Sequence, residues 1–294
     1  MKKRVSVRNF VRLLLIDAVV LVLLRVILGL SGCFDQRAQR ANSDRRAVSL
    51  PVLMYHSIRR GPESDYAVTP DTLEEDLAYM QRLGWQTVSS EQICNYVFHG
   101  DALPDNPVLL TFDDGFYNNL AYALPLLEKY DMCATVNVVG EFTQILAEAD
   151  SHSAVYSYLT ADDLRTMLES GQITLGNHTT NLHHQSARMG CRIMPNEPED
   201  AYSAVLRADI GSLQTYLAQE TGISPIVFAY PYGFDCPESV PILRELGFLI
   251  TLSCREGVNI LTDDPECLYG LRRYNRFGYY TTEGYFSHII DDFP

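Results

Sequence analysis

Two spacings of apolar residues alternate along residues 50–252. Short apolar runs typical of buried strands, beginning with Pro51–Tyr55, are separated by stretches in which apolar residues recur every three or four positions, as on one face of a helix. The first such stretch runs from Asp71 to Leu83 and places its apolar residues at Leu73, Leu77, Met80 and Leu83. This helix is predicted to begin after Thr69-Pro70 and to end at Gly84.

The same alternation predicts an α/β fold. Strands are predicted over residues 108–113, 133–139, 172–176, 225–230 and 248–252, and helices over 117–130, 160–169, 198–220 and 237–246. Strands that alternate with helices of this length form right-handed βαβ units, so we expect a parallel sheet with functional groups at the carboxyl ends of its strands. Because no internal repeat is visible, residues 50–294 are predicted to form one catalytic domain.

The N-terminal 32 residues have a different character. A basic head precedes the apolar stretch Leu13–Leu30, which is typical of an export signal or of a membrane anchor. Asp17 and Arg25 interrupt the stretch and weaken a full transmembrane helix. The tetrapeptide ending at Cys33 also resembles the lipobox of bacterial lipoproteins, in which this cysteine would carry lipid. An uncleaved anchor, a lipoprotein and a cleaved signal stay open. All three predict an extracytoplasmic protein of the bacterial cell surface, which is either anchored to the membrane or secreted.

Composition restricts the partners. The net charge of -14 and the absence of a stripe dense in Lys and Arg beyond residue 46 argue against nucleic acid and suit a neutral sugar polymer or a cationic product. Residues 33–49 are polar, lack periodic apolar positions and are predicted to be a linker. No C-x-x-C spacing exists among the seven cysteines, so a cysteine-based zinc site is not expected; with Cys33 lipidated, the other six allow fifteen pairings.

Two adjacent acids stand at the end of the predicted strand 108–113. Asp113 and Asp114 precede Gly115, and neighbouring carboxylates repel each other unless a cation lies near them. Successive side chains of a strand point to opposite faces, so both acids reach one pocket only where the strand unwinds, which Gly115 permits. In the structural alternative, Asp114 caps the helix that follows.

Histidines follow the next-but-one predicted strand. His178 and His183 are five positions apart, about 140° on a helix, so a loop is needed to bring them together. His184 is a competing ligand, and solvated loop histidines are the structural alternative. One aspartate and two imidazoles can hold a divalent metal, zinc by ligand softness, with one position open for water and the second carboxylate as base. The pattern therefore predicts a metal-dependent hydrolase.

These segments resemble the polysaccharide deacetylase family, the NodB-homology carbohydrate esterases. The matching pieces are Thr111–Gly115, His178–His183, Pro51–His56 and Phe228–Gly233, in the family's order. The resemblance implies a distorted (β/α) barrel of parallel strands that removes acetyl groups from N-acetylated sugars. It makes Asp113 the catalytic base and gives the metal to Asp114, His178 and His183. The histidine spacing of five, where four is commoner, resembles the subgroup near the bacterial poly-N-acetylglucosamine deacetylases.

The resemblance also assigns residues around the metal. The turn at Tyr232 is the implied backbone donor to the oxyanion. Tyr230, Pro231 and Tyr117 are expected to contact substrate, with a place in the core as the alternative for the aromatic rings.

Two family features have no direct counterpart. The family often has an arginine at the position of Ala229, where it tethers the base, and Arg273 or Arg276 is expected to replace it. The late Leu-x-His that supplies the general acid has no clean match. His56, at a strand end, is better placed for that role than His288.

Two other functions stay open. An O-acetyl esterase on the same metal site would tolerate a weak general acid, because an alkoxide leaves more readily than an amine anion. A catalytically silent, surface-tethered glycan-binding protein would bind the polymer without metal. In each case the expected partner is an acetylated polysaccharide of the cell wall or the extracellular matrix, together with the membrane through residues 1–32.

Overall fold

The computed structural model of the protein describes residues 47–147 and 152–294. The predicted anchor over residues 1–32 and most of the predicted linker over 33–49 lie outside this part. Within the described residues, no helix has the length and the apolar character needed to cross a membrane.

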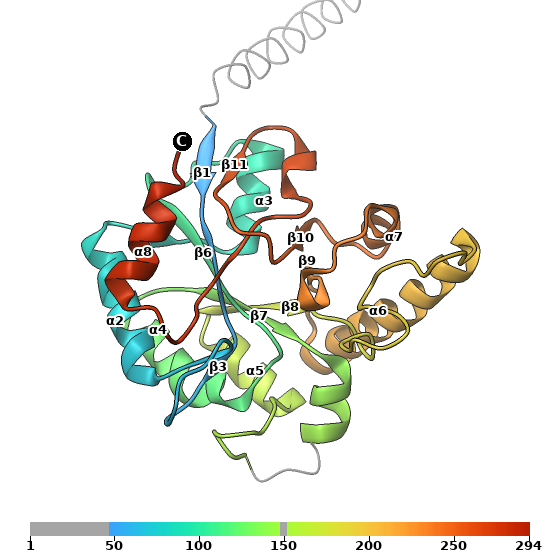
Figure 1. Cartoon of the computed structure of the whole chain (residues 1–294), viewed down its shortest axis with the longest axis horizontal. Helices are drawn as coiled ribbons and strands as arrows, with labels where there is room; N and C mark the ends of the chain where they lie inside the picture. The colour runs from blue at the N-terminus through green and yellow to red at the C-terminus, as the bar shows by residue number, and fades with distance from the viewer. Residues whose placement is uncertain (1–46, 148–151) are drawn as a thin grey trace, which may run out of the picture. The chain divides into compact units, whose positions relative to one another are not determined.

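A curled parallel sheet forms the centre of the fold (Figure 1). Its strands follow the order β10-β9-β8-β7-β6-β2-β12, with β5 paired beside β6, and every pairing is parallel. This confirms the predicted parallel sheet. The strands are β2 Val52–Tyr55, β5 Gln86–Thr87, β6 Pro107–Phe112, β7 Ala134–Val138, β8 Ile173–Asn177, β9 Val227–Ala229, β10 Ile250–Leu252 and β12 Tyr274–Asn275.

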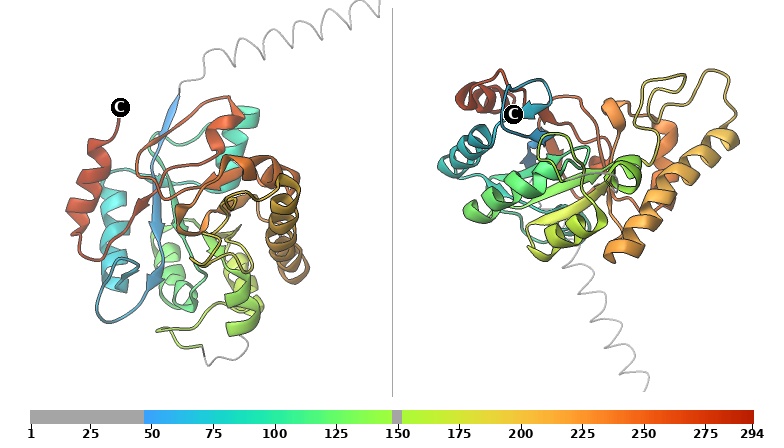
Figure 2. Two further views of the ribbon diagram at one scale, coloured as in Figure 1. Left: turned by 45° about the vertical axis from the view of Figure 1, so that its right-hand side comes forward. Right: turned by 90° about the horizontal axis from the view of Figure 1, so that it is seen from below.

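Helices lie around this sheet (Figures 1 and 2). Thr69 and Thr160 cap α2 and α5 with their side chains. The prediction missed α3 and α8, although Ser89 and Gln92 form a capping box at the start of α3. The helices are α2 Pro70–Arg82, α3 Ser90–His99, α4 Leu124–Tyr130, α5 Ala161–Glu169, α6 Glu199–Thr221, α7 Val240–Glu245 and α8 Thr282–Asp291, and a π-helical turn over Asn119–Ala123 leads into α4.

Both faces of the sheet are buried. Leu53 and Leu110 face a core formed with α2, α4 and α8, whereas the adjacent Val52 and Leu109 face a second core with α3. Strands buried on both sides need continuous apolar runs, and this is the reason that the sequence shows runs there instead of alternation.

One late segment joins the two edges of the curled sheet. Leu271 forms a parallel bridge with Leu252 of β10, and Tyr274 of β12, three residues later, pairs with Leu53 of β2. Strands that join both edges complete the barrel-like curl. The same segment therefore projects Arg273 and Arg276 into the interior, where both are buried.

Short pairings complete the described part. Val48 and Ser49, which the sequence analysis places in the linker, belong to the strand β1 Val48–Leu50. This strand pairs antiparallel with β11 Asn259–Leu261. Its partner is too distant in sequence for the local pattern to reveal the pairing. A two-stranded pairing of β3 Ser57–Ile58 with β4 Ala67–Val68 follows β2.

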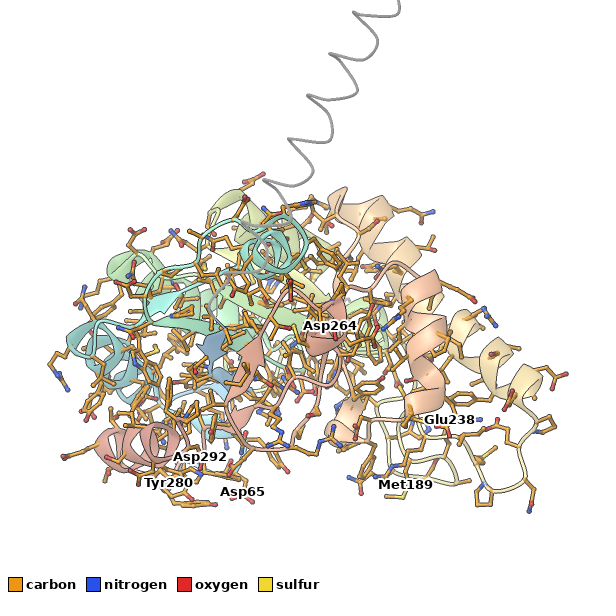
Figure 3. The ribbon with its side chains drawn as sticks, turned by 90° about the horizontal axis from the view of Figure 1, so that it is seen from above. Asp65, Met189, Glu238, Asp264, Tyr280 and Asp292 are labelled. Carbon is orange, nitrogen blue, oxygen red and sulfur yellow. The ribbon has the colours of Figure 1, made fainter. Side chains whose placement is uncertain are left out.

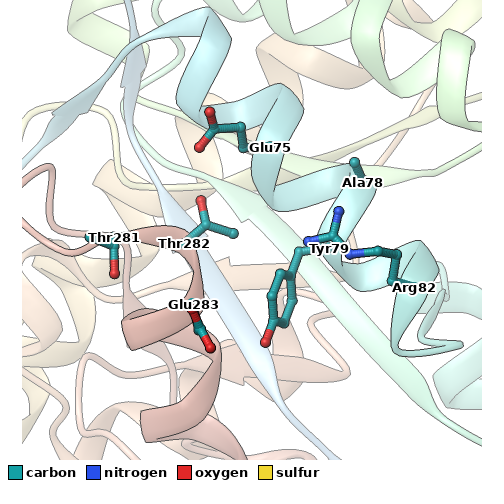
Figure 4. A pocket seen from close by; sticks show the side chains of 7 residues that line it. All are labelled: Glu75, Ala78, Tyr79, Arg82, Thr281, Thr282 and Glu283. Carbon is teal, nitrogen blue, oxygen red and sulfur yellow. The ribbon is translucent and has the colours of Figure 1, made fainter.

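Arg276 forms a buried ion pair with Asp76 of α2. Nε of Arg276 lies 2.7 Å from Oδ2 of Asp76 and Nη2 lies 3.2 Å from Oδ1. The hydroxyls of Tyr55 and Thr282 also donate to this carboxylate, at 3.0 and 2.7 Å. Thr282 stands at the edge of a groove between α2 and α8 (Figure 4). The pair thus links α2, β2, α8 and the segment that joins the sheet edges.

Replacing Asp76 with alanine leaves the Arg276 charge buried and unpaired. We expect the free energy of unfolding to fall by about 3–5 kcal/mol, as measured by urea denaturation. The matched control is Glu74→Ala, also on α2, which removes an exposed ion pair with Lys129 of α4 and should leave the stability nearly unchanged. Equal losses in the two variants would contradict a stabilising role for the buried pair.

Candidate active site

The chain unwinds directly after β6. Asp113 still donates its amide to the carbonyl of Tyr55 at 2.9 Å, but Asp114 has a φ of 73° and Gly115 a φ of 69°. These left-handed conformations turn the two acids into one pocket instead of to opposite faces. The helix-cap alternative is wrong, because the helical residues begin at Tyr117, three positions beyond Asp114, and among the described residues no backbone amide donates to buried Oδ1 of Asp114.

Asp114, His178 and His183 form a cluster of potential metal ligands. Oδ1 of Asp114 lies 3.2 Å from Nε2 of His183 and 3.8 Å from Nε2 of His178, and one ligand atom from each residue lies within 4.8 Å of the others. No hydrogen bond of good geometry from the described residues reaches Asp114 Oδ1, which is buried. A carboxylate oxygen and two imidazole nitrogens that converge in this way fit a divalent metal.

Hydrogen bonds fix the loop that carries the two histidines. The amides of Thr180 and Asn181 donate to the two carboxylate oxygens of Asp209 on α6, at 2.9 and 2.8 Å. Thr179 has a φ of 72°, and its amide donates to the side chain of Asn177 at 2.9 Å. The sequence analysis expected a polar loop here but did not identify Asp209, because it lies on a helix with no motif around it.

The backbone orients the His178 ring. Its Nδ1 lies 2.7 Å from the carbonyl oxygen of Ala229, an arrangement that places the proton on Nδ1 and leaves the Nε2 lone pair directed toward Asp114. Burial lowers the pKa of His178 to about 4, so the ring is neutral at pH 7. His184, the competing ligand in the sequence analysis, is exposed and is not part of the cluster.

Asp113 is held by Arg273. Nη1 and Nη2 of the arginine each lie 2.8 Å from one carboxylate oxygen, and Asn137 donates a further hydrogen bond of 2.7 Å. Burial acts to raise the pKa of Asp113, but the Arg273 charge outweighs it and keeps this pKa well below its usual range. Of the two arginines expected to replace the family's tether, the structure therefore selects Arg273, and Arg276 pairs with Asp76 instead.

A cavity of about 650 Å³ opens over these groups. Asp113, Asp114, His178 and His183 lie in its wall, and so does His56, whose pKa is lowered by burial. The other lining side chains are Met54, Tyr66, Phe116, Gln185, Tyr232, Phe234, Cys254, Glu256, Asn275 and Phe277. His288 is not among the lining residues; its Nε2 lies 3.1 Å from a carboxylate oxygen of Glu256.

None of the three predicted substrate contacts, Tyr230, Pro231 and Tyr117, lines the cavity, whereas Tyr232, the predicted oxyanion donor, does. Tyr232 is 38% exposed in the cavity wall, at a φ of 57°, and its hydroxyl lies 3.3 Å from the carbonyl oxygen of His183. Tyr230 is 1% exposed and its hydroxyl shares a hydrogen bond with Ser239, so its ring belongs to the core. Pro231 is buried and does not line the cavity.

The third of these expected contacts, Tyr117, also lies elsewhere. Its ring packs against the main core and lies 4.7 Å, between ring centroids, from that of His152, and it does not line the cavity. Tyr230 therefore belongs to the core, which is the alternative given in the sequence analysis, and Tyr117 lies outside the cavity wall. Aromatic residues beside a motif serve the core as readily as the site, and sequence alone does not separate the two uses.

Comparison with known proteins agrees with this geometry. A family model described as polysaccharide deacetylase matches residues 100–250. A poly-beta-1,6-N-acetyl-D-glucosamine N-deacetylase of Escherichia coli is 25% identical over 211 residues, which cover 65% of this chain but only 31% of the relative. A putative polysaccharide deacetylase of Bacillus subtilis is 26% identical, over 78% of this chain and 71% of the relative.

Solved structures share the fold. A Streptococcus pyogenes deacetylase in complex with acetate superposes with a TM-score of 0.65 at 23% identity, over 82% of this chain and 98% of that one. A de-N-acetylase of Aggregatibacter actinomycetemcomitans gives 0.69 at 20% identity, over 81% and 100% of the two chains. IcaB from Ammonifex degensii gives 0.63 at 25% identity, over 76% and 91%.

Acid should destabilise the metal-free protein through His178. The pKa of a histidine is about 6.5 in an unfolded chain, and that of His178 is about 4 in the folded protein. Between about pH 4 and about pH 6.5 the unfolded state therefore binds the proton more readily than the folded state. The free energy of unfolding should therefore fall as the pH drops from about 6.5 to about 4, by up to about 3 kcal/mol for this residue. His56, whose pKa is also lowered, acts in the same direction.

Urea denaturation of metal-free protein across this pH range measures the effect. We expect the pH dependence to be clearly shallower in His178→Gln than in the wild type. The control is His99→Gln, which removes an exposed imidazole at the end of α3 and should keep the wild-type slope. A wild-type slope in His178→Gln would contradict the prediction.

Proposed function

The chain belongs to the polysaccharide deacetylase family, and from this membership we propose that it is a metal-dependent hydrolase of N-acetylated polysaccharide that contains N-acetylglucosamine. The observation that carries the proposal is the convergence of Asp114, His178 and His183 within 4.8 Å beside Asp113, in the wall of one cavity. Residues 50–294 are proposed as the catalytic domain.

Asp114, His178 and His183 would hold the divalent metal, for which we propose zinc because carboxylate and imidazole suit it. When bound, such an ion lowers the pKa of water and polarises the acetyl carbonyl. Asp113 is kept ionised by Arg273, so it is always in the form that accepts a proton from the attacking water. The fork from Arg273 also fixes the direction in which this carboxylate points.

The remaining steps fall to Tyr232 and His56. The left-handed turn at Tyr232 is held by hydrogen bonds from the amides of Gly233 and Phe234, and we assign the Tyr232 amide as a donor to the developing oxyanion. His56 is assigned as the acid that protonates the leaving nitrogen, for which its ring must carry a proton. Burial lowers the pKa of His56, and the charges of Asp114 and Asp113 counteract this effect and favour the protonated ring. Its place in the cavity wall supports this role, whereas His288 pairs with Glu256 and does not line the cavity.

The names of the relatives support the choice of substrate. Two of the compared proteins, from Escherichia coli and Staphylococcus aureus, are named poly-beta-1,6-N-acetyl-D-glucosamine N-deacetylases. We therefore propose a β-1,6-linked N-acetylglucosamine polymer as the first substrate to test. The basic head and the apolar stretch before residue 33 support an extracytoplasmic location at the cell surface, with the membrane or lipidated Cys33 as the anchor.

Metal removal should abolish activity. We expect the purified protein to release acetate from a β-1,6-linked N-acetylglucosamine oligomer, to lose this activity when dialysed against a chelator, and to regain it with zinc. His183→Ala should contain less zinc than the wild type by elemental analysis and should release no acetate. Acetate release that continues in fully metal-free protein would refute the metal-dependent mechanism.

Asp113→Asn is the matched variant for this experiment. It should keep the metal but lower the rate by about 10²- to 10⁴-fold, because a group that accepts the proton is lost. A silent glycan-binding protein would instead show no acetate release in the wild type, and its glycan binding would be the same with and without metal.

His56→Gln should separate amide from ester hydrolysis. Loss of the acid should lower acetate release from the N-acetylated oligomer by about 10²-fold or more. Release from an aryl acetate should fall far less, because a phenolate leaves without a proton. The control, His288→Gln, should leave both rates unchanged. Preference of the wild type for O-acetylated over N-acetylated oligosaccharide would favour the O-acetyl esterase.

A further inference from the structure

Four aromatic side chains continue the wall of the cavity onto the surface. Tyr66 is 61% exposed, Tyr279 is 65% exposed and Tyr280 is 38% exposed, and Phe277 is half-buried beside them. We call these four residues the aromatic platform. Apolar rings that stay in contact with water cost free energy, so a contiguous group of them marks a surface that another molecule covers.

The platform is continuous with the active-site cavity. Tyr66 and Phe277 both line the cavity, and the ring centroid of Tyr66 lies 5.0 Å from that of His56. Phe277 lies 5.1 Å from Tyr279 and 5.9 Å from Tyr280, and these two tyrosines lie 5.0 Å from each other, all between ring centroids. The rings therefore extend outward from the proposed general acid.

The backbone under the platform is fixed. Nη1 of Arg276 donates to the carbonyl oxygens of Phe277 and Tyr280, at 2.6 and 3.0 Å, while the rest of its guanidinium is held by Asp76. The buried ion pair that the catalytic mechanism leaves unused therefore holds the turn that presents the rings. A fixed turn reduces the entropy lost when a ligand binds.

The segment that carries Phe277, Tyr279 and Tyr280 packs closely against the segment that carries Tyr66. The amide of Gly278 donates to the carbonyl of Ser64 at 2.9 Å, and Asn275 donates to that of Asp65 at 2.8 Å. A Cβ atom at position 278 would lie 2.4 Å from the Cβ of Glu63, so only glycine permits this approach. Asp65 and Tyr280 accordingly lie at the same edge of the molecule (Figure 3).

Carboxylates flank the rings. Asp65 directly precedes Tyr66 of the platform in the chain. Glu256 lines the cavity. Sugar residues offer apolar ring faces to aromatic side chains and hydroxyl groups to hydrogen-bond acceptors, and the platform provides partners for both.

We propose that the aromatic platform is a second sugar subsite, which binds the residues of the polymer next to the acetylated residue in the cavity. The proposal rests on the function proposed above. It makes the protein selective for oligomers and polymers over single sugars, because only a longer chain covers the platform while its acetylated residue occupies the cavity.

The test compares chain lengths. The quantity measured is the ratio of two kcat/KM values, one for a β-1,6-linked N-acetylglucosamine pentamer and one for the methyl glycoside of N-acetylglucosamine. We expect the double variant Tyr279→Ala/Tyr280→Ala to lower this ratio by about tenfold. The double variant Tyr279→Phe/Tyr280→Phe keeps the rings and should restore most of the ratio. Phe98→Ala, which removes an exposed aromatic side chain on α3, is the matched control and should keep the wild-type ratio.

Direct binding separates this proposal from the proposed function. Calorimetry measures binding of the pentamer to protein from which a chelator has removed the metal. The alanine double variant should bind the pentamer more weakly than the wild type does, whether or not the wild type releases acetate. An unchanged ratio together with an unchanged Kd would overturn the subsite. A ratio that stays constant while sedimentation shows the variant to have lost a dimer would assign the platform to self-association and would overturn it equally.

Discussion

Two neighbouring carboxylates can share one pocket only if each has a different electrostatic partner. Asp113 has a guanidinium with one nitrogen on each of its oxygens, and Asp114 has two imidazole nitrogens and no strong donor of good geometry among the described residues. The first arrangement satisfies a negative charge completely, whereas the second leaves a place for a cation. The division of labour that we propose, with Asp113 as the base and Asp114 as a metal ligand, follows from this asymmetry, although the two residues are adjacent and chemically identical.

The asymmetry depends on the segment that joins the two edges of the sheet. Leu271 pairs with β10 and Tyr274 with β2, and the residues between and after them supply Arg273 to Asp113 and Arg276 to Asp76. One stretch of backbone therefore completes the sheet, neutralises the base and supports the aromatic platform. Each buried cation is stabilised because a carboxylate is already held in place on an earlier element.

The sequence predicted the parallel sheet because its strands are buried on both faces and appear as unbroken apolar runs. It also indicated the ligand cluster, because Asp114, His178 and His183 stand where strands end. It did not select between Arg273 and Arg276, because the two are three positions apart and only the three-dimensional path of the segment distinguishes them. The strand β1 was missed because its partner is distant in sequence, and Asp209 was missed because no motif surrounds it on its helix. Tyr230 failed as a predicted contact because its neighbours, not its type, decide whether it faces solvent.

The distance along the chain between Asp113 and its arginine has a consequence for biosynthesis. The two residues are 160 positions apart, so during translation the acid emerges from the ribosome long before the group that neutralises it. A chain interrupted before residue 271 contains the whole ligand cluster but has a buried negative charge without a counter-ion. A buried charge without its counter-ion destabilises the folded state, so the native form of this pocket depends on a contact that only a chain synthesised past residue 273 can make.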